Sequence, residues 1–183
     1  RFVVFQSAAS NLVPGDTNGV PDIFLRDLEA QTTVRVSVAW SSGGAQANGG
    51  SDSPVISADG RYVAFASAAD NLVPGDTNGE SDVFVFDRQT ETLTLASRAP
   101  GVDGIVGNGY SGSPALVADG LAVIFESSAT NLGPIVPAGV SQIYGRDLET
   151  HANYLLSRAS GPDGAAGNLS SEEPSIAADG DRI

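Results

Sequence analysis

The stretch SPVISADGRYVAFAS, residues 53–67, decides the fold expected of this 183-residue chain. Its first part, SPVISA, is a short run that contains a proline near its start and predicts a strand. Asp59-Gly60 predicts a two-residue turn, because Asp and Gly both tolerate a positive φ. RYVAFAS, residues 61–67, predicts the returning strand. The whole stretch therefore predicts an antiparallel hairpin.

The hairpin recurs along the chain at a period of 60 residues. Its aspartate stands at Asp59, Asp119 and Asp179, and other residues keep the same spacing, among them Pro14, Pro74 and Pro134, Phe5, Phe65 and Phe125, and Asp27, Asp87 and Asp147. The chain is thus three gap-free units, residues 1–60, 61–120 and 121–180, followed by three further residues. Such a period predicts repeated structural elements that stack on one another.

The second unit shows the layout expected of all three. Its predicted strands are residues 61–67, 83–86, 93–97 and 113–118, the last of them equivalent to residues 53–58 of the first unit. A polar loop is expected at residues 71–82, a turn at 87–92 and a Gly-rich connection at 101–112. Helical periodicity is absent, so the predicted fold class is all-β.

The strands predict burial on both faces, because residues such as Tyr62, Val63, Ala64 and Phe65 are apolar in succession. Four-stranded antiparallel sheets stacked face to face, the blades of a β-propeller, satisfy this requirement. A β-solenoid is the alternative, although its coils are usually shorter and rarely need an Asp-Gly hairpin in every repeat.

The hairpin stretch resembles the repeat of TolB-like propellers, the WD40-like PD40 repeat, in which a Ser-Pro-Asp-Gly turn precedes an Ile/Val-x-Phe strand. The loop sequence NLVPGDTNG, at residues 11–19 and 71–79, is similar to a bacterial, mostly exported subgroup. The resemblance covers all three units and implies four-stranded blades, six of them being common in such propellers. Ala58, Ala118 and Ala178 depart from it, since many relatives have proline before Asp-Gly.

The first and last residues predict that the chain is a piece of a larger propeller. We expect it to start in the second strand of a blade and to end just after the first strand of the next, at Ser171–Ala178. Further blades of the same polypeptide would then complete the ring. Alternatively, Ser171–Ala178 of one copy would complete the sheet of Arg1–Ser7 in another copy, as a ring or a fibre.

The composition excludes several classes of partner. The net charge of −13 comes from 22 acidic residues against nine arginines, with no lysine, so neither nucleic acid nor an anionic lipid surface is expected to bind. No apolar run is long enough for a membrane span. The absence of cysteine excludes disulfides and thiolate metal sites.

Two loops predict a weak calcium site. Their side-chain oxygens are those of Asp16, Asn18 and Asp22 in the first unit and Asp76, Asn78 and Asp82 in the second, with a glycine after each asparagine. Calcium loops place oxygens at alternate positions around such a glycine. Pro14 and Leu25 stand where two further ligands would be. The alternative is a purely structural loop, and the third unit favours it, because residues 133–142 keep the glycine and lose every acid.

Other recurring polar residues have structural interpretations. Asp27, Asp87 and Asp147 are expected to form Asx-turns between the third and fourth strands. Asn48, Asn108 and Asn168 are expected to satisfy backbone groups in the Gly-rich connections. The single histidine, His151, is interpreted as a solvated turn residue. Trp40 has no equivalent in the other units and is either a packing residue or a partner contact.

These observations predict a non-catalytic binding or scaffolding module of an exported or cell-surface bacterial protein, located in the periplasm, at the cell surface or outside the cell. Its partner would be a protein or further blades, with calcium as the one expected ligand. Two alternatives stay open. One is the propeller part of a secreted hydrolase or lyase, and the other is a subunit of a filament or surface layer.

Overall fold

The computed structural model describes residues 1–40, 43–161 and 164–177, and its named elements are all β-strands. The strands are β1 (Phe2–Ser7), β2 (Asp22–Asp27), β3 (Thr32–Arg35), β4 (Val38–Ala39), β5 (Ala45–Gln46), β6 (Ser51–Ile56), β7 (Tyr62–Ser67), β8 (Asp82–Asp87), β9 (Thr92–Leu95), β10 (Ser111–Leu116), β11 (Ala122–Ser127), β12 (Gln142–Asp147) and β13 (Asn153–Leu155). The predicted all-β class is confirmed.

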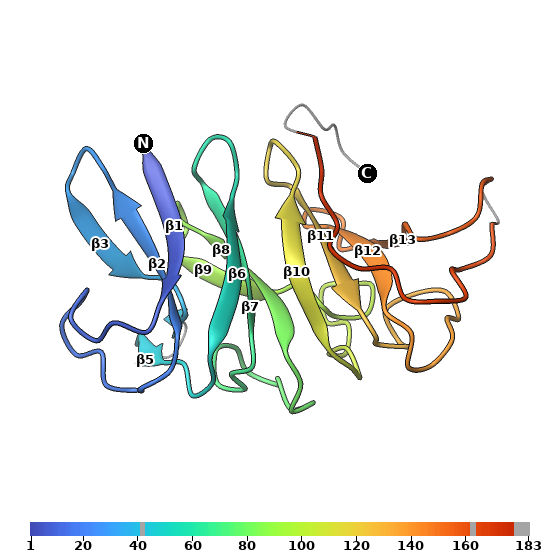
Figure 1. Ribbon diagram of the computed structural model, residues 1–183, viewed down its shortest axis with the longest axis horizontal. Helices are drawn as coiled ribbons and strands as arrows, with labels where there is room; N and C mark the ends of the chain where they lie inside the picture. The colour runs from blue at the N-terminus through green and yellow to red at the C-terminus, as the bar shows by residue number, and fades with distance from the viewer. Residues whose placement is uncertain (41–42, 162–163, 178–183) are drawn as a thin grey trace.

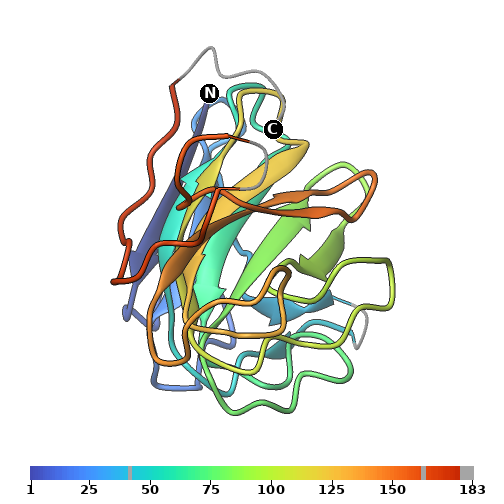
Figure 2. The same ribbon diagram turned by 90° about the vertical axis from the view of Figure 1, so that its right-hand side faces the viewer.

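Three antiparallel sheets form the body of the molecule. Their strand orders are β1-β2-β3, β6-β7-β8-β9 and β10-β11-β12-β13, and a small ribbon pairs β4 with β5. The sheets stand side by side, each twisted relative to the next (Figure 1). Seen from the third sheet, they overlap as successive layers (Figure 2). The predicted four-stranded propeller blades are therefore present, with the predicted strand boundaries shifted by one or two residues.

The predicted two-residue turn is wrong in its detail. Gly60 has a φ of +74°, whereas Asp59 is not among the residues with positive φ. The backbone N–H of Gly60 donates to the carbonyl of Ser57 at 2.9 Å, and the Asp59 carboxylate accepts from the N–H of Arg61 at 2.9 Å. The turn is thus a four-residue β-turn with glycine at its last position, which needs one left-handed residue instead of two.

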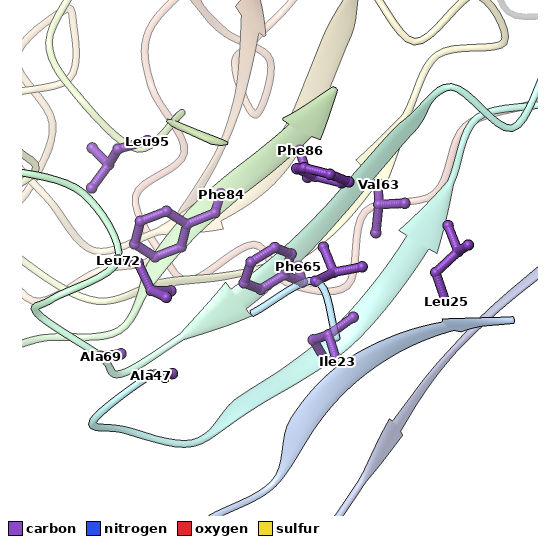
Figure 3. Close-up of a cluster of buried hydrophobic side chains, with 11 residues drawn as sticks. Ile23, Leu25, Ala47, Val63, Phe65, Ala69, Leu72, Phe84, Phe86 and Leu95 are labelled. Atoms are coloured by element: carbon purple, nitrogen blue, oxygen red, sulfur yellow. The ribbon is translucent and has the colours of Figure 1, made fainter. Parts of the chain in front are cut away.

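Apolar side chains from both faces of the middle sheet fill the space between the sheets. On one face, Val63, Phe65 and Phe84 pack against the first sheet (Figure 3). On the other face, Ala64, Val83 and Val85 pack against the third sheet, in a cluster that also holds Val123, Phe125, Tyr144 and Leu155. Val63 and Ala64 are neighbours in sequence, and both are fully buried. This confirms the prediction of strands that are buried on both faces.

The two interfaces between sheets use different chemistry at the same position. Trp40 of the first unit stacks on Phe86 with ring centroids 4.5 Å apart, and its Nε1–H donates to the carbonyl of Val36 at 3.0 Å. Trp40 is therefore a packing residue. At the second interface Arg146 replaces the phenylalanine and is 1% exposed. Its guanidinium donates to the carbonyls of the preceding connection, at Arg98, Ala99 and Gly101. Burial lowers the pKa of Arg146 to about 10, with a smaller effect from Arg98.

An aromatic ring of the preceding sheet packs against each of two hairpin turns. A Cβ added to Gly60 would lie 2.5 Å from the ring of Phe2, and one added to Gly120 would lie 2.3 Å from the ring of Tyr62. The Arg88 guanidinium lies over the Phe2 ring, 3.9 Å from the ring centroid. Glycine is therefore required at each of these two turn positions for two reasons: its φ is left-handed, and the aromatic ring lies where a Cβ would be.

The segment after the third sheet repeats one feature of a first strand. Glu173 has a φ of +53°, matching +51° at Ser53 and +49° at Ser113 in β6 and β10. The N–H of Ser171 donates to the carbonyl of Ser141, as that of Ser111 does to Ser81. Residues 171–177 pair with no strand of the described chain. Ala178 and Asp179 lie outside the described residues, so the division of the chain into partial blades stays a prediction.

Replacing Gly60 by alanine should lower the free energy of unfolding by about 2–5 kcal/mol. The left-handed φ costs about 1–2 kcal/mol, and the clash with Phe2 adds about 1–3 kcal/mol. Gly79→Ala is the matched control, because Gly79 has a φ of +71° and nothing within 4 Å of the added Cβ. Urea denaturation of both variants measures the difference. An equal loss in the two variants would show that the aromatic contact contributes nothing.

Candidate functional site

The candidate site lies in the loops between the second and third strands of each unit, at the lower end of the sheets in Figure 1. These loops fold back on the blade instead of lying open in solvent. In the second unit Leu72 is fully buried in the core and Asp76 is 5% exposed. A loop that buries a leucine and a carboxylate must satisfy the carboxylate from within the protein.

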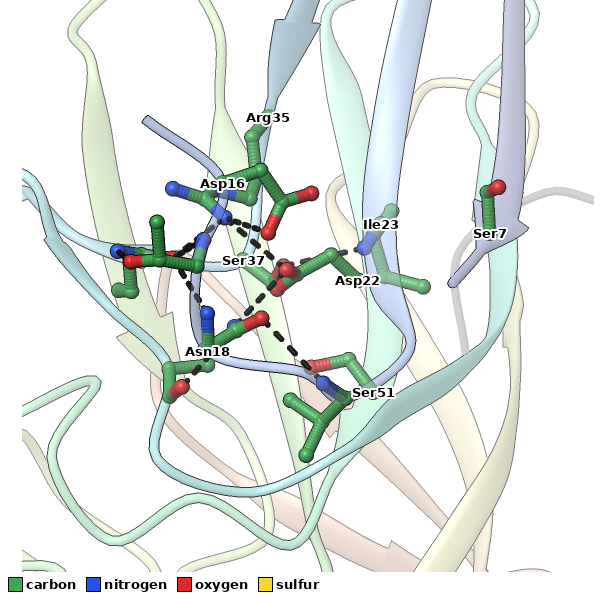
Figure 4. A network of polar contacts seen from close by, with 12 residues as sticks. Ser7, Asp16, Asn18, Asp22, Ile23, Arg35, Ser37 and Ser51 are labelled. Carbon is green, nitrogen blue, oxygen red and sulfur yellow. Dashed lines mark hydrogen bonds and ion pairs between the residues drawn. The ribbon is translucent and has the colours of Figure 1, made fainter. Parts of the chain in front are cut away.

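In the first unit, Arg35 pairs with the buried loop carboxylates of Asp16 and Asp22 (Figure 4). Nη1 of Arg35 lies 3.0 Å from Oδ1 of Asp16 and 3.1 Å from Oδ2 of Asp22, and all three side chains are at least 92% buried. The same nitrogen donates to Oε1 of Gln46 at 3.0 Å. That oxygen also accepts the backbone N–H groups of Thr17 and Asn18. Arg35 thus carries the positive charge that joins two loop carboxylates.

Asp22 also organises the strand that follows the loop. Its Oδ1 accepts from the hydroxyl of Ser37 at 2.6 Å, and its Oδ2 accepts from Nδ2 of Asn18 at 2.9 Å. The hydroxyl of Ser37 in turn accepts the N–H of Ile23 at 3.0 Å. Two of the three predicted ligands, Asn18 and Asp22, are therefore brought together, and Asp16 joins them through Arg35.

The second unit keeps the carboxylates and loses the arginine. Asp82 is fully buried and accepts from Ser97 and, at 2.6 Å, from Nδ2 of Asn78. Leu95 occupies the position of Arg35, and Val106 that of Gln46. Oδ1 of Asp76 is buried and has no hydrogen-bond partner among the described protein atoms.

The electrostatic consequence is a pair of carboxyl groups with raised pKa values. Burial raises the pKa of Asp76 to about 6, and the charges of Asp82 and Asp70 add to the effect. The backbone N–H of Asn78 opposes it by donating to the Asp76 carboxylate. Burial also raises the pKa of Asp82, against the hydrogen bonds from Ser97 and Asn78. The charged form of Asp76 is therefore poorly compensated.

In the third unit, uncharged residues replace both buried carboxylates. Gln142 stands in the place of Asp82, and its Oε1 accepts from the hydroxyl of Ser157 at 2.7 Å. Its Nε2 donates to the carbonyl of Gly167 at 3.0 Å, the bond that Asn78 makes to Gly107 in the second unit. Val136 replaces Asp76 and joins the apolar cluster. Gln142 thus makes the two hydrogen bonds that Asp82 and Asn78 make separately in the second unit.

Sequence reasoning missed Arg35 and Gln46. The aligned units show that the aspartate is kept between Asp16 and Asp76, whereas Arg35 is replaced by Leu95 and Gln46 by Val106. Among the described residues, no group of three or more His, Cys, Asp or Glu side chains is arranged to hold a metal. The predicted calcium ligands of the two loops stay a prediction, and any cation there would rest on two carboxylates and neutral oxygens.

The predicted Asx-turns are confirmed. Oδ1 of Asp27 accepts the N–H groups of Glu29 and Ala30, and Oδ1 of Asp147 accepts those of Glu149 and Thr150. Oδ1 of Asp87 accepts the N–H of Gln89 at 2.8 Å. Each turn ends in a left-handed residue without a glycine, and His151, with a φ of +58°, is the third of them. His151 is therefore a turn residue, as predicted.

The recurring asparagines join successive units. Oδ1 of Asn48 accepts the N–H of Asp70, and Oδ1 of Asn71 accepts the N–H of Asn48. Asn108 makes the same pair of bonds with Thr130 and Asn131. The structural interpretation of Asn48 and Asn108 is confirmed, but their partners lie in the loop of the next unit. Asn168 is exposed.

Comparison with known proteins supports the fold alone. TolB from Acinetobacter baumannii superposes with a TM-score of 0.53 at 21% identity, over 92% of this chain and 32% of that one. Two further structures overlap less well. A prolyl endopeptidase has a TM-score of 0.46 at 18% identity, over 74% of this chain and 19% of that one. An oligogalacturonate lyase in complex with manganese has a TM-score of 0.43 at 12% identity, over 85% of this chain and 32% of that one. With TM-scores below 0.5, these two likenesses carry no functional information.

The chain therefore has the TolB-like β-propeller fold and spans about a third of the length of that TolB structure. No protein-family model matches the sequence, and no curated protein is significantly similar to it. In the part of the chain that the structure describes, no helix is long and apolar enough to cross a membrane.

Neutralising Asp76 should change how stability depends on pH. The pKa of this carboxyl rises from 3.8 to about 6 on folding, so the folded chain holds a proton that the unfolded chain releases between these values. The free energy of unfolding therefore falls as pH rises through this window, by about 2–3 kcal/mol at 1.36 kcal/mol per unit. Asp76→Asn should then stabilise the chain by about 2 kcal/mol at pH 7.5 and by little at pH 4.

Urea denaturation at the two pH values, in EDTA, measures the effect. Asp103→Asn serves as the control, because it makes the same charge change at an exposed position. We expect its effect to be small at both pH values. A stabilisation by Asp76→Asn that is equal at pH 4 and pH 7.5 would contradict the raised pKa.

Proposed function

We propose that this chain is a non-catalytic binding or scaffolding module, part of a larger propeller in an exported or cell-surface bacterial protein. The supporting observation is the use of the recurring polar side chains. The aspartates, serines and asparagines that repeat from unit to unit hold turns, strands and neighbouring blades together. Because the recurring polar residues serve the fold, we expect a partner to contact surface positions that differ between the units.

The face formed by the first strands offers the best surface for a partner. This face consists of β6, β10 and residues 171–177. Each of its three segments carries a non-glycine residue with a left-handed φ at the same position: Ser53, Ser113 and Glu173. In β6 and β10 the residue lies in a bulge, where the register with the second strand shifts. Strained, bulged positions of this kind re-aim side chains and occur often beside functional sites.

Acidic side chains gather on this face around one tyrosine. Burial, together with the charges of Glu126 and Asp52, raises the pKa of Tyr110. The Tyr110 hydroxyl lies over Gly112, 2.1 Å from where a Cβ would be. Glu126 accepts the N–H of Glu173 at 3.2 Å, which brings the following segment to the same place. The face therefore suits a partner segment that carries positive charge.

The edges of the described sheets support association with further blades or a second copy. β1 has no neighbour on its outer side, and residues 171–177 have the first-strand bend without a strand to pair with. Val3 of the first sheet is 44% exposed, and Leu156, just after the last strand, is 37% exposed. Unpaired edges and exposed apolar faces favour pairing with another chain segment. Assembly into a ring or a filament is the second candidate function.

Fluorescence anisotropy with two labelled peptides of equal length, one with net charge +4 and one with −4, tests the binding proposal. We expect the cationic peptide to bind, with an affinity that falls as salt rises. A variant with Asp52→Asn, Glu126→Gln and Glu173→Gln should bind it at least threefold more weakly than a variant with Glu80→Gln, Glu91→Gln and Asp103→Asn.

The two variants have the same net charge, so a difference between them locates the binding face. Equal loss in both would show that the peptide responds to net charge alone and would contradict the assignment of the face. Turnover of a prolyl peptide or of oligogalacturonate by the purified chain would contradict a non-catalytic role.

A further inference from the structure

The loop of the second unit contains a buried carboxylate oxygen that has no hydrogen-bond partner among the described protein atoms. This oxygen is Oδ1 of Asp76, a residue that is 5% exposed. Asp82, whose charge acts on Asp76, is fully buried. An ionised carboxylate buried in this way is strongly destabilising unless a positive charge reaches it.

The first unit shows what fits the equivalent position. There a single nitrogen of Arg35 lies 3.0 Å from Asp16 and 3.1 Å from Asp22, so one positive centre contacts both carboxylates (Figure 4). In the second unit the residue that would supply this nitrogen is Leu95, and both carboxylates remain. In the third unit the carboxylates themselves are replaced, by Val136 and Gln142.

We propose that the loop of the second unit, and not that of the first, binds a hard divalent cation such as calcium between Asp76 and Asp82, at the place that the Arg35 guanidinium fills in the first unit. This inference does not depend on the proposed function of the first-strand face. It narrows the calcium hypothesis from two loops to one, because Arg35 already contacts both carboxylates of the first loop.

The available oxygens determine the class of ion and its affinity. Asp76 offers a carboxylate oxygen without a hydrogen-bond partner, and each oxygen of Asp82 accepts a single hydrogen bond, which leaves it a second lone pair. The side-chain oxygen of Asn78 accepts the N–H of Glu80 at 2.9 Å and faces the same loop. Calcium accepts such mixed oxygen sets, with water completing the shell. Two carboxylates suit a dissociation constant of about 10⁻⁴–10⁻³ M, as in extracellular calcium modules.

The test is isothermal titration of the intact chain with CaCl₂ at pH 7.5, with thermal melts at 0 and 10 mM calcium. The wild type should bind one calcium ion per chain and melt at a higher temperature with calcium. Leu95→Arg, which brings in the arginine of the first unit, should abolish the binding and the calcium-dependent shift. Asp76→Asn should do the same while leaving the fold intact. Asp16→Asn, the matched change in the first loop, should leave both responses in place.

Arg35→Leu is the converse experiment. Removing the arginine should make Asp16 and Asp22 available to a cation, so the variant should bind two calcium ions per chain instead of one. If this variant fails to fold, Leu95→Arg still decides the question, because it adds a compensating charge instead of removing one. Binding of two calcium ions by the wild type would overturn the restriction to the second loop. No response of the wild type at 10 mM calcium, or an equal response in Leu95→Arg, would overturn the site itself.

Discussion

The structure depends on face-to-face contact between sheets that are apolar on both sides. Phe65 and Phe84 of the middle sheet point toward the first sheet, and Ala64 and Val83 point toward the third. Burial of apolar surface gives about 25 cal/mol per Å², so a blade gains its stability from its neighbours more than from its own hydrogen bonds. The turns, connections and loops lie where this stacking places them, and Leu72 fixes the polar loop to the same core.

Within this constant framework the polar positions vary from unit to unit. The first unit combines Asp16 with Arg35, the second has Asp76 and Leu95 at these positions, and the third has Val136 and Leu155, which share an apolar cluster. The first combination is a buried ion pair, and the third is apolar packing. Both leave no buried charge without a partner, as a stable interior requires. The second combination breaks the rule, and departures of this kind are expected where a protein has a function to serve.

Much of the fold could be predicted from the sequence because the period is exact in length and the strands are short and apolar. The number of strands in each unit, their order and the burial of both faces followed from residues such as Val63 and Ala64. The detailed turn could not be predicted, because Asp59 tolerates both signs of φ and the choice depends on the hydrogen bond between Gly60 and Ser57. Trp40 was ambiguous because its partner, Phe86, lies in another unit.

The candidate site was predictable in its residues but not in its charge balance. Asn18 and Asp22, and likewise Asn78 and Asp82, are close in sequence, and their contact follows from the loop pattern. Arg35 lies 19 residues from Asp16, and only the folded hairpin of β2 and β3 brings them together. The bonds between Asn48 and Asn71 cross from one unit to the next, so no reading of a single unit could find them.

Hydrogen exchange of the backbone amides, followed by mass spectrometry, tests the dependence on stacking most directly. The middle sheet has a neighbour on each face, whereas each outer sheet has one neighbour among the described residues. If stacking supplies the stability, β7 and β8 should exchange more slowly than their equivalents β1 and β2, and more slowly than β11 and β12. Equal protection of the equivalent strands in all three sheets would show that each sheet is stable by itself, and it would contradict the account.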